Sequence, residues 1–483
     1  MARTDHGLLS TPPDDVHGRL LQSSLDDLGL EFTPDGQFVR WSMANPRHPR
    51  NWHKLRKMYD SGLIIWLDLF TTAVSTGGGL GGIVFPPYSE AFGRKKLYTV
   101  STALYSVFCA IVGVVPSIGG VVVGRFVSGF LSAIPTTVVA GSIEDMFNTK
   151  DRIWMIYLWA MVSNIGLITG PIMSTYITAA LGWRWMFYVS AIVMAVTTGL
   201  LFAIRESRPS LILSREVAKL RKVTGNDDLH ALNPDHTPDT RTFARLVLFR
   251  PLHLFFTEPI VCLVAVMGAI AFALIYLFTE ALPPIYEALG FSATSAPLPF
   301  LAIGVGLLLG LLTRVLDTRI LENHYRAGRP IAPEHKLIGF TIGAPVLAGA
   351  LWWFAWTIPP RVHNVHWMVS TTSLVFIGYS LNEFDTVLAG YLADSYLSYA
   401  ASGFAAVALL RSTMSAAFPL FASYMFQGLS ANVAVSVLAA LATLFCMVPR
   451  LFTQYGERIR ARSKFAKYSL QVYQENGVDR NGF

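Results

Sequence analysis

Long apolar segments, separated by short polar or basic gaps, follow one another along the chain from residue 59 onward. Eleven of them are long enough to cross a bilayer as helices, which takes about 20 residues. Most are apolar on all sides and lack the single apolar stripe of a soluble amphipathic helix. The pattern predicts an all-α polytopic membrane protein with spans at 59–80, 97–116, 119–142, 153–178, 184–205, 257–283, 297–316, 337–358, 366–393, 399–425 and 431–449.

Basic residues gather in alternate gaps between these spans. The gap at 93–96, the region 206–256 and the tail after residue 449 are basic, whereas the gaps at 117–118 and 284–296 contain no Lys or Arg. Positively charged loops stay on the cytoplasmic side of a membrane. We therefore expect the 93–96 loop, the central loop and the C-terminus to lie in the cytoplasm.

The central polar region divides the apolar segments into two groups, which predicts two pseudo-symmetric helical bundles with a site between them. We expect a disordered, basic cytoplasmic tail over 1–57 and an N-terminal bundle of five spans over 58–205. A cytoplasmic loop over 206–256 then leads to a C-terminal bundle of six spans over 257–451. Residues 452–483 form a second cytoplasmic tail.

The first span raises a topological problem, because basic clusters flank it on both sides. A second crossing is needed to bring both clusters to the same side, and two spans with a turn need about 45 residues. Only about 27 residues lie between Tyr59 and Phe85. The favoured interpretation is that most of the second helix is missing. A re-entrant hairpin and a true eleven-span chain with an external N-terminus are the alternatives.

Composition supports a membrane protein and excludes several other classes. Charged residues make up 14% of the chain, against about 25% in soluble proteins. The net charge of +7 comes from Lys and Arg in short loops, so it does not indicate nucleic-acid binding. A GxxxxGKS/T phosphate-binding motif is absent from the sequence, which argues against ATP-driven transport. The three cysteines lack metal-site spacing, and we expect no metal or cofactor.

Several short motifs occur in a recognisable order and spacing. They are NPRHPRNW (45–52), SEAFGRKK (89–96), GRFVSG (124–129), GLITGP (166–171), GWRWMF (182–187), ESRP (206–209), YLADSYLSYAAS (391–402) and YGERIRARSKFA (455–466). Together they resemble the major facilitator superfamily, and within it the fungal drug:proton antiporters with twelve spans. Four positions depart from the family pattern: Pro86 replaces a glycine, Glu90 an aspartate, and Ser174 and Thr175 the glycines that usually follow the GLITGP motif.

The resemblance implies a secondary active transporter and not an enzyme. It implies proton-coupled efflux of a drug, toxin or secondary metabolite across the plasma membrane, with a small molecule, protons and the lipid bilayer as partners and a monomeric chain. Two other functions stay open at this point. One is a non-transporting truncated paralogue or sensor, and the other is a proton-coupled uptake or polyamine porter.

Glycine spacing and loop charges give candidates for conformational change. Two glycines four residues apart let helices touch backbone to backbone, and a following proline bends the helix. Charges at a helix–loop junction could stabilise one conformation, although topological anchoring alone would also explain them. The candidates are Gly129, Gly166, Gly170 and Pro171 in the spans, and Glu90, Gly93, Arg94 and Lys95 in the loop.

Ionisable side chains inside apolar spans are expensive, at about 2.5–3.5 kcal/mol each on insertion scales. An antiporter needs a carboxylate that gains and loses a proton near a basic partner. We expect Asp68 to work with Arg125, and Glu383 or Asp385 to work with Arg411; structural ion pairs are the alternative. Glu280 is a sixth intramembrane charge, near the end of its span.

Polar and aromatic residues at helical spacing suggest a substrate cavity. Tyr379, Asn382, Glu383 and Thr386 share one helix face, and such a face must look into the bundle or a wet cavity. Phe272 and Tyr276 are one turn apart and could stack on a flat ligand, although ordinary packing would also account for them.

Overall fold

The protein is described by a computed structural model. It describes residues 16–33, 38–42, 45–74, 85, 88–89, 92–232, 251–326, 333–361, 365–396, 400–463 and 465–467. Apolar segments that are long enough to span a bilayer form helices, which satisfy the backbone N–H and C=O groups within the segment, as hydrocarbon requires.

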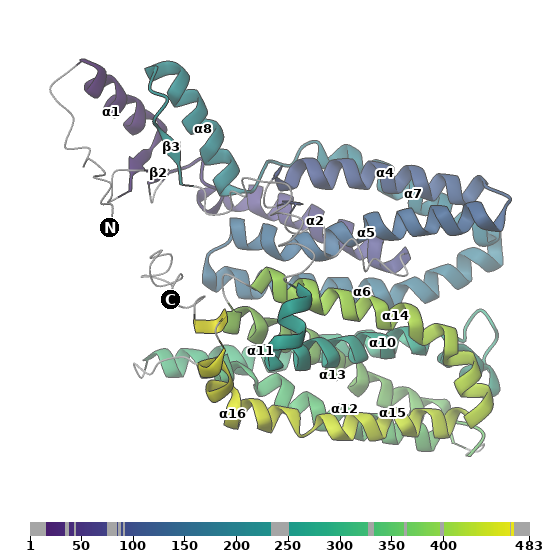
Figure 1. Ribbon diagram of the computed structural model, residues 1–483. Helices are drawn as coiled ribbons and strands as arrows, with labels where there is room; N and C mark the ends of the chain where they lie inside the picture. Colours follow the sequence, from purple (N-terminus) through teal and green to yellow (C-terminus); the bar gives the residue numbers. More distant parts are fainter. Residues whose placement is uncertain are drawn as a thin grey trace.

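The N-terminal half is one bundle of long helices, drawn in purple and blue in Figure 1. It consists of α2 (Lys54–Val74), α4 (Arg94–Val114), α5 (Ile118–Met146), α6 (Thr149–Leu181) and α7 (Trp183–Leu201).

The C-terminal half is a second bundle, drawn in green and yellow (Figure 1). It consists of α10 (Pro259–Ala288), α11 (Phe300–Arg326), α12 (Ile338–Thr357), α13 (Trp367–Tyr396), α14 (Ala400–Leu429) and α15 (Ala431–Phe445), with the short helix η2 (Pro333–Lys336) and the amphipathic helix α16 (Val448–Arg462) at one end.

The two halves repeat one arrangement of helices. In the first half α4 packs on α5 and α7, and α2 packs on α5 and α6. In the second half α12 packs on α13 and α15, and α10 packs on α13 and α14. The halves meet where α6 contacts α11 and α13. A site between the halves is therefore lined by α6 on one side and by helices of the second bundle on the other.

Nine of the described helices are long and apolar enough to cross a membrane. Two helices that we expected to span, α2 and α13, are not among them, because charged and other polar residues lower their mean hydropathy. The expected number of eleven spans is thus not confirmed. The expected loss of the second helix concerns residues 75–92, and most of this segment lies outside the described residues.

A small subdomain at one end of the N-terminal half joins the N-terminal segment to the central region (Figure 1). Strand β1 pairs antiparallel with β2, and β2 pairs parallel with β3. Leu25, Val39, Leu213 and Val217 are fully or almost fully buried in its core. Its elements are α1 (Val16–Leu28), β1 (Leu30–Phe32), β2 (Phe38–Trp41), α8 (Pro209–Thr224) and β3 (His230–Ala231), while the short helix η1 (Pro49–Asn51) contacts α5.

This subdomain differs from the disordered tail and polar loop that we expected from the sequence. Several apolar residues of α1 pack on α8, which lies beside α1 in space but follows the first bundle in the sequence. In addition, Asn45 donates hydrogen bonds to the carbonyls of Leu28 and Gly29, which fixes the chain after β2.

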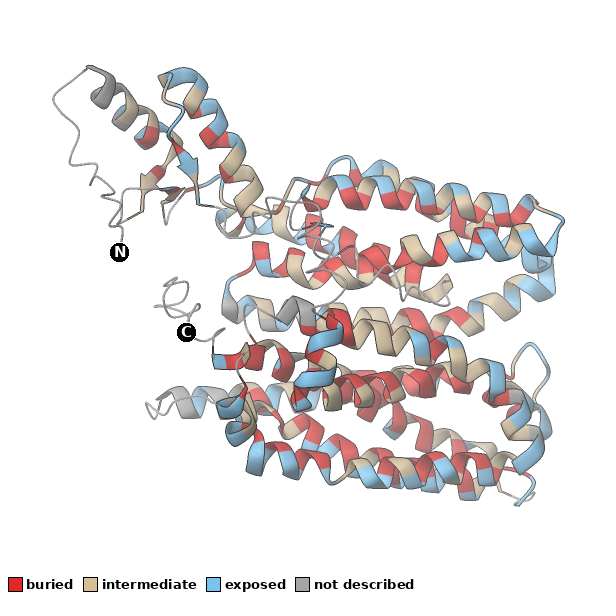
Figure 2. Ribbon diagram, in the orientation of Figure 1, coloured by how far each residue is buried: buried red, intermediate tan, exposed pale blue. Residues whose placement is uncertain are grey.

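Burial follows the pattern expected of a protein that sits in lipid (Figure 2). Buried residues line the contacts between helices, while many large apolar residues are exposed on the sides of the bundles. Val122, Val123, Phe126 and Leu312 are examples of exposed apolar side chains on spanning helices. In a soluble protein so much exposed apolar surface would cause aggregation, whereas a bilayer solvates it.

Candidate functional site

A small cavity lies between the two halves. Asn164 of α6 lines it from the N-terminal half; Phe272 of α10, Asp385 of α13 and Arg411 of α14 line it from the C-terminal half. Its volume of about 10 Å³ is about enough for a single water molecule. In this conformation an organic molecule could not fit, so a substrate would need the halves to move apart.

Both charged residues that line the cavity, Asp385 and Arg411, are among those that the sequence indicated. Arg411 forms an ion pair and hydrogen bond with Asp385. Its guanidinium carbon also lies 4.4 Å from the centre of the Phe272 ring, a cation–π contact. Phe272 packs in turn on Tyr276, with ring centres 5.6 Å apart. Of the two partners considered for Arg411, the structure therefore pairs it with Asp385.

Asp68 faces the same region from α2. It is fully buried, and its Oδ2 accepts a hydrogen bond of 2.7 Å from Trp159 Nε1 on α6. Its Oδ1 has no hydrogen-bond partner among the described residues. The charge of Asp385 in the other half has a small electrostatic influence on Asp68.

Arg125 lies elsewhere in the N-terminal half. Its Nη1 donates to the carbonyl of Val74 at 3.5 Å, and its guanidinium carbon lies 4.7 Å from the centre of the Phe187 ring. Arg125 and Gly129 line a second cavity of about 10 Å³ between α2, α4, α5 and α7. Asp68 and Arg125 thus have different partners in this conformation, and Glu280 is exposed on α10.

The predicted polar face of α13 is buried against α11 and α12. The Tyr379 hydroxyl shares a 2.9 Å hydrogen bond with Thr313, and Asn382 and Glu383 are fully buried. Thr386 donates to the carbonyl of Asn382. These four side chains are therefore on one face, as expected, but they do not line the central cavity that Asp385 and Arg411 line.

Two charged residues beside Glu383 were not predicted as site residues. The sequence interpretation ended the span at residue 316 and placed Arg314 in a basic loop, whereas α11 continues to Arg326. Arg314 Nη1 lies 3.2 Å from Asp317 Oδ2, and Arg314 Nη2 lies 3.6 Å from Glu383 Oε2. Arg314 and Asp317 are one helical turn apart, and this spacing could have indicated an ion pair within a longer helix.

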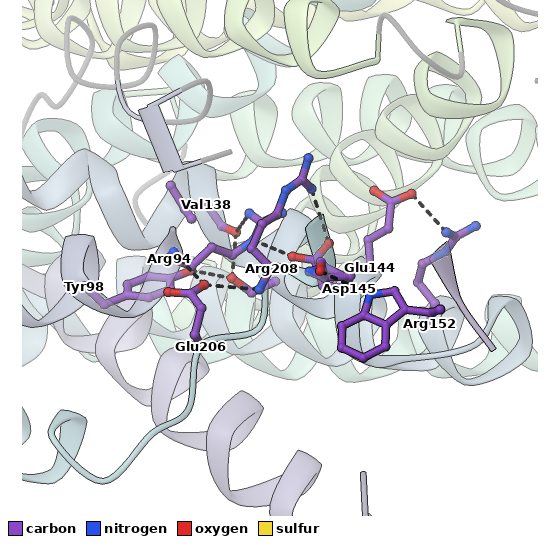
Figure 3. Close-up of polar contacts among 11 residues, drawn as sticks. Arg94, Tyr98, Val138, Glu144, Asp145, Arg152, Glu206 and Arg208 are labelled. Carbon is purple, nitrogen blue, oxygen red and sulfur yellow. Dashed lines mark hydrogen bonds and ion pairs between the residues drawn. The ribbon is translucent and has the colours of Figure 1, made fainter. Parts of the chain in front are cut away.

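The loop motif forms a buried cluster of charges, which Figure 3 shows. Arg94 Nε lies 2.6 Å from Asp145 Oδ2, and Arg208 Nη1 lies 3.4 Å from Asp145 Oδ1. Glu206 accepts hydrogen bonds from the backbone N–H groups of Arg94 and Lys95. We call Arg94, Asp145, Glu206 and Arg208 the N-terminal charge cluster. It joins the start of α4, the end of α5 and the entrance to α8.

Two glycines make room for this cluster. Gly93 has a φ of +97°, and a β-carbon there would lie 2.6 Å from both Glu206 Oε2 and Leu211 Cδ2. A β-carbon at Gly141 would lie 2.5 Å from Arg94 Nη1. Glu206 places a negative charge at the N-terminus of α4, where free N–H groups and the helix dipole favour it.

Of the residues predicted in this loop, Arg94 and Gly93 take part in the cluster. The Lys95 ammonium instead donates to the carbonyl of Phe202, and Glu90 lies outside the described residues. Asp145 was missed. A carboxylate near the C-terminus of a helix opposes the helix dipole unless a cation pairs with it, and that conflict was the signal available in the sequence.

The glycine pair of α6 packs within the N-terminal half. A β-carbon at Gly166 or Gly170 would lie 2.5 Å from the carbonyl oxygen of Leu69 or Ala73, respectively, on α2. Pro171 lies inside α6, directly after this contact. The opposite side of α6 meets the second half, where Ile168 approaches Gly304 of α11. α6 therefore contacts α2 closely on one side and the other bundle on the other.

A second set of ion pairs lies at the corresponding end of the C-terminal half. Lys336 Nζ lies 2.6 Å from Asp394 Oδ2, and Arg460 of α16 makes a bidentate contact with Glu334 of η2. The Tyr391 hydroxyl also donates to Glu334. We call Glu334, Lys336, Asp394 and Arg460 the C-terminal charge cluster. Among the described residues, no group of three or more His, Cys, Asp or Glu is arranged to hold a metal ion.

Comparisons with known proteins agree with this arrangement. A family model described as the Major Facilitator Superfamily matches residues 58–419. The multidrug transporter TPO1_2 of Candida glabrata is 34% identical over 391 residues, which cover 80% of this chain and 67% of that protein. The MFS-type transporter penM of Penicillium rubens is 34% identical over 470 residues, covering 90% and 92% of the two chains.

A solved structure shares the fold. The partially occluded, inward-open xylose transporter XylE of E. coli aligns with a TM-score of 0.50 at 14% identity, over 89% of this chain and 94% of that one. The expected helical membrane fold is thereby confirmed, and the family is one of transporters and not of enzymes. The chain belongs to the major facilitator superfamily of integral membrane transporters.

Proposed function

We propose that this chain exports a small organic compound across the plasma membrane in exchange for protons. Its relatives include proteins named as multidrug transporters. The observation that carries the proposal is the ion pair of Asp385 and Arg411 that lines the central cavity, together with the fully buried carboxylate of Asp68 in the other half. Asp68 comes from one half, and Asp385 with Arg411 comes from the other. The protein acts as a monomer, with its C-terminus in the cytoplasm.

Alternating access follows from the contacts between the halves. Because the central cavity is too small for an organic molecule, the contacts of α6 with α11 and α13 must open for substrate to enter. Phe272 offers an aromatic face, and Tyr276 supports its ring. Tyr379, Asn382 and Thr386 pack against α11 and α12 in this conformation, and they would contribute polar groups to the substrate path only if α13 also shifted against these helices.

Proton exchange depends on how well each carboxylate is neutralised. Asp68 has a neutral donor in Trp159 and an unpartnered oxygen among the described groups. A buried carboxylate without a cation is costly, so it takes up a proton readily. Asp385 is neutralised by Arg411, and a substrate that competes for either member would release the other. Arg125 takes part in proton coupling within the first half, where it donates to the carbonyl of Val74 at the end of α2.

The test uses the full-length protein in liposomes, with a panel of fluorescent organic dyes that includes ethidium. Antiport predicts that liposomes with an acidic lumen accumulate dye, and that Asp68→Asn and Asp385→Asn abolish the effect of the pH gradient. Glu280→Gln is the matched control, since it neutralises an exposed intramembrane carboxylate outside the cavity.

Other results would identify the rival functions. Accumulation that requires an acidic exterior would show proton-coupled uptake. Binding of a dye without any movement across the membrane would show a non-transporting sensor. Either result would overturn the proposed export.

A further inference from the structure

A second set of buried charges lies apart from the central cavity. It consists of Tyr157, Arg314, Asp317, Asn382 and Glu383, which we call the α13 cluster. Asn382 and Glu383 are fully buried, and Asp317 is 4% exposed. None of the five lines the central cavity, which α13 borders with Leu381 and Asp385. The cluster therefore needs an explanation of its own.

The charges of the α13 cluster do not balance. Asp317 and Glu383 are two carboxylates, and Arg314 is the one guanidinium that contacts them among the described residues. If both carboxylates were ionised, one negative charge would remain buried without a counter-charge, which a low-dielectric interior strongly disfavours. One bound proton makes the cluster neutral.

No other charged group among the described residues compensates this charge. From α6 the cluster meets the Tyr157 ring, 5.6 Å from the Arg314 guanidinium carbon, and α13 itself adds Tyr379, which bonds to Thr313 of α11. α12 presents Gly339 and Gly343. The remaining neighbours are already paired: Arg411 of α14 with Asp385, and Lys336 and Glu334 of η2 with Asp394 and Arg460.

Many polar atoms of this cluster lack a hydrogen bond among the described residues. Both oxygens of Asp317, both oxygens of Glu383 and both polar atoms of the Asn382 amide have no hydrogen-bond partner among the described residues. Native proteins seldom bury so many unpaired polar atoms together except where they have a function. The carboxylate oxygens of Asp317 and Glu383 are therefore available to bind and release a proton.

Glycines on two helices make space for the Glu383 carboxyl group. A β-carbon at Gly339 would overlap Glu383 Oε2. At Gly310 a β-carbon would lie 3.1 Å from Glu383 Oε1, 2.7 Å from Asn382 Nδ2 and 3.1 Å from the Tyr157 hydroxyl oxygen. Three polar groups from two halves therefore converge on one point beside Gly310, and Tyr157 is the member that the N-terminal half contributes.

We propose that Glu383 and Asp317 share one exchangeable proton at a site separate from the central cavity, and that Tyr157 closes this site. Arg314 is a positioning residue that keeps the second carboxylate ionised. Because Tyr157 belongs to α6, separation of the halves withdraws it and admits water. A carboxylate then gains a proton from water, or a carboxylic acid returns one, so protonation is tied to the conformation that opens this side. The inference rests on the proposed proton coupling.

The first experiment measures the proton without any substrate. Infrared difference spectra of the purified full-length protein, recorded over about pH 5 to pH 9, detect the carbonyl stretch of protonated carboxyl groups. We expect Glu383→Gln to remove one titrating component and Asp317→Asn to shift or remove the same component. Glu280→Gln serves as the matched control and should leave that component in place, since Glu280 is exposed on another helix. An unchanged spectrum in Glu383→Gln would overturn the proposal.

Space around the carboxyl group gives a second variant that retains every titratable residue. Gly339→Ala displaces the Glu383 carboxyl group and should shift its component, whereas Gly349→Ala on the same helix has nothing within 4 Å and should leave it unchanged. Equal spectra for these two variants would contradict the proposal that Gly339 makes space for the Glu383 carboxyl group. Monodisperse elution of each variant checks that it folds.

Transport in liposomes separates this inference from the proposed function. If the wild-type protein moves dye in response to a pH gradient, Glu383→Gln should still bind dye but lose the response to the gradient. Gradient-driven accumulation that survives in Glu383→Gln would overturn the second proton site while leaving export intact. If the wild-type protein moves no dye, export fails, and the infrared comparison alone decides whether the site binds a proton.

Discussion

The two halves of this transporter share one helix arrangement but hold their end charges in different surroundings. In the N-terminal charge cluster the side chains of Arg94 and Asp145 are 4% and 7% exposed. In the C-terminal charge cluster Lys336 and Asp394 occupy the corresponding places, before α12 and near the end of α13, and are 28% and 33% exposed. The same topological position is thus buried in one half and open to solvent in the other.

This difference has energetic consequences. Breaking a buried ion pair leaves an uncompensated charge in the interior, whereas an exposed pair is screened by water and loses little when it is broken. The N-terminal cluster also satisfies the free N–H groups at the start of α4 through Glu206. At the start of α12 no side chain caps the helix. We therefore expect the N-terminal half to depend more strongly on its cluster.

The largest effect should come from Asp145→Asn. The substitution leaves the guanidinium groups of Arg94 and Arg208 in a buried site without their shared carboxylate. A loss of about 3–5 kcal/mol is typical when one partner of a buried pair is removed. Thermal or denaturant unfolding of the full-length protein in detergent, followed by tryptophan fluorescence, measures this loss.

The control for Asp145→Asn is the adjacent carboxylate. Glu144 is 60% exposed and pairs with Arg152, so Glu144→Gln should cost less than about 1 kcal/mol. Similar losses for the two variants would show that burial of the pair does not set its energy.

A smaller loss is expected from Gly93→Ala. At a φ of +97° any β-carbon is strained, and here it would also displace Glu206 from the N-terminus of α4. Gly182→Ala provides a comparison at a φ of +87° with nothing within 4 Å. Backbone strain of about 1–3 kcal/mol applies to both, and loss of the carboxylate cap adds about 1 kcal/mol at Gly93 only. Equal unfolding midpoints for Gly93→Ala and Gly182→Ala would show that the Glu206 cap does not contribute to stability.

Helix packing provides a third contrast between the halves. Gly166→Ala inserts a β-carbon 2.5 Å from the Leu69 carbonyl oxygen, so α2 and α6 must separate. At the corresponding contact of α10 and α14, a β-carbon at Gly268 would lie 3.7 Å from Val407, an ordinary distance. We expect Gly166→Ala to cost about 1–3 kcal/mol and Gly268→Ala to be close to neutral. The same unfolding assay measures both, and a larger loss for Gly268→Ala would contradict the packing argument.

Much of the architecture could be predicted from the sequence, because hydropathy and loop charge depend on local composition. The helical fold and the family were predicted correctly, and the pairing of Asp385 with Arg411 was one of two alternatives considered. The spacing of Gly166 and Gly170 correctly indicated backbone contact, although not that α2 would be the partner.

Long-range partners could not be predicted in the same way. Trp159 as the donor to Asp68 depends on how α6 packs on α2, which spacing within one helix does not reveal. Arg314 was missed because a falling hydropathy value marks the end of an apolar segment and not the end of its helix. The subdomain that contains α1 was missed because its core comes from two polar segments, one before and one after the first bundle in the sequence.

The smallest effect should be found in the C-terminal charge cluster. A double-mutant cycle of Lys336→Gln and Asp394→Asn should give a coupling energy of about 0.2–1 kcal/mol. Because both side chains are about one-third exposed, added salt should reduce this coupling further. The matching cycle of Arg94→Gln and Asp145→Asn should keep most of its coupling in salt. A Lys336–Asp394 coupling energy that is large and insensitive to salt would mean that the second half also buries this ion pair during the transport cycle. The difference in burial between the two halves would then be a property of this conformation alone.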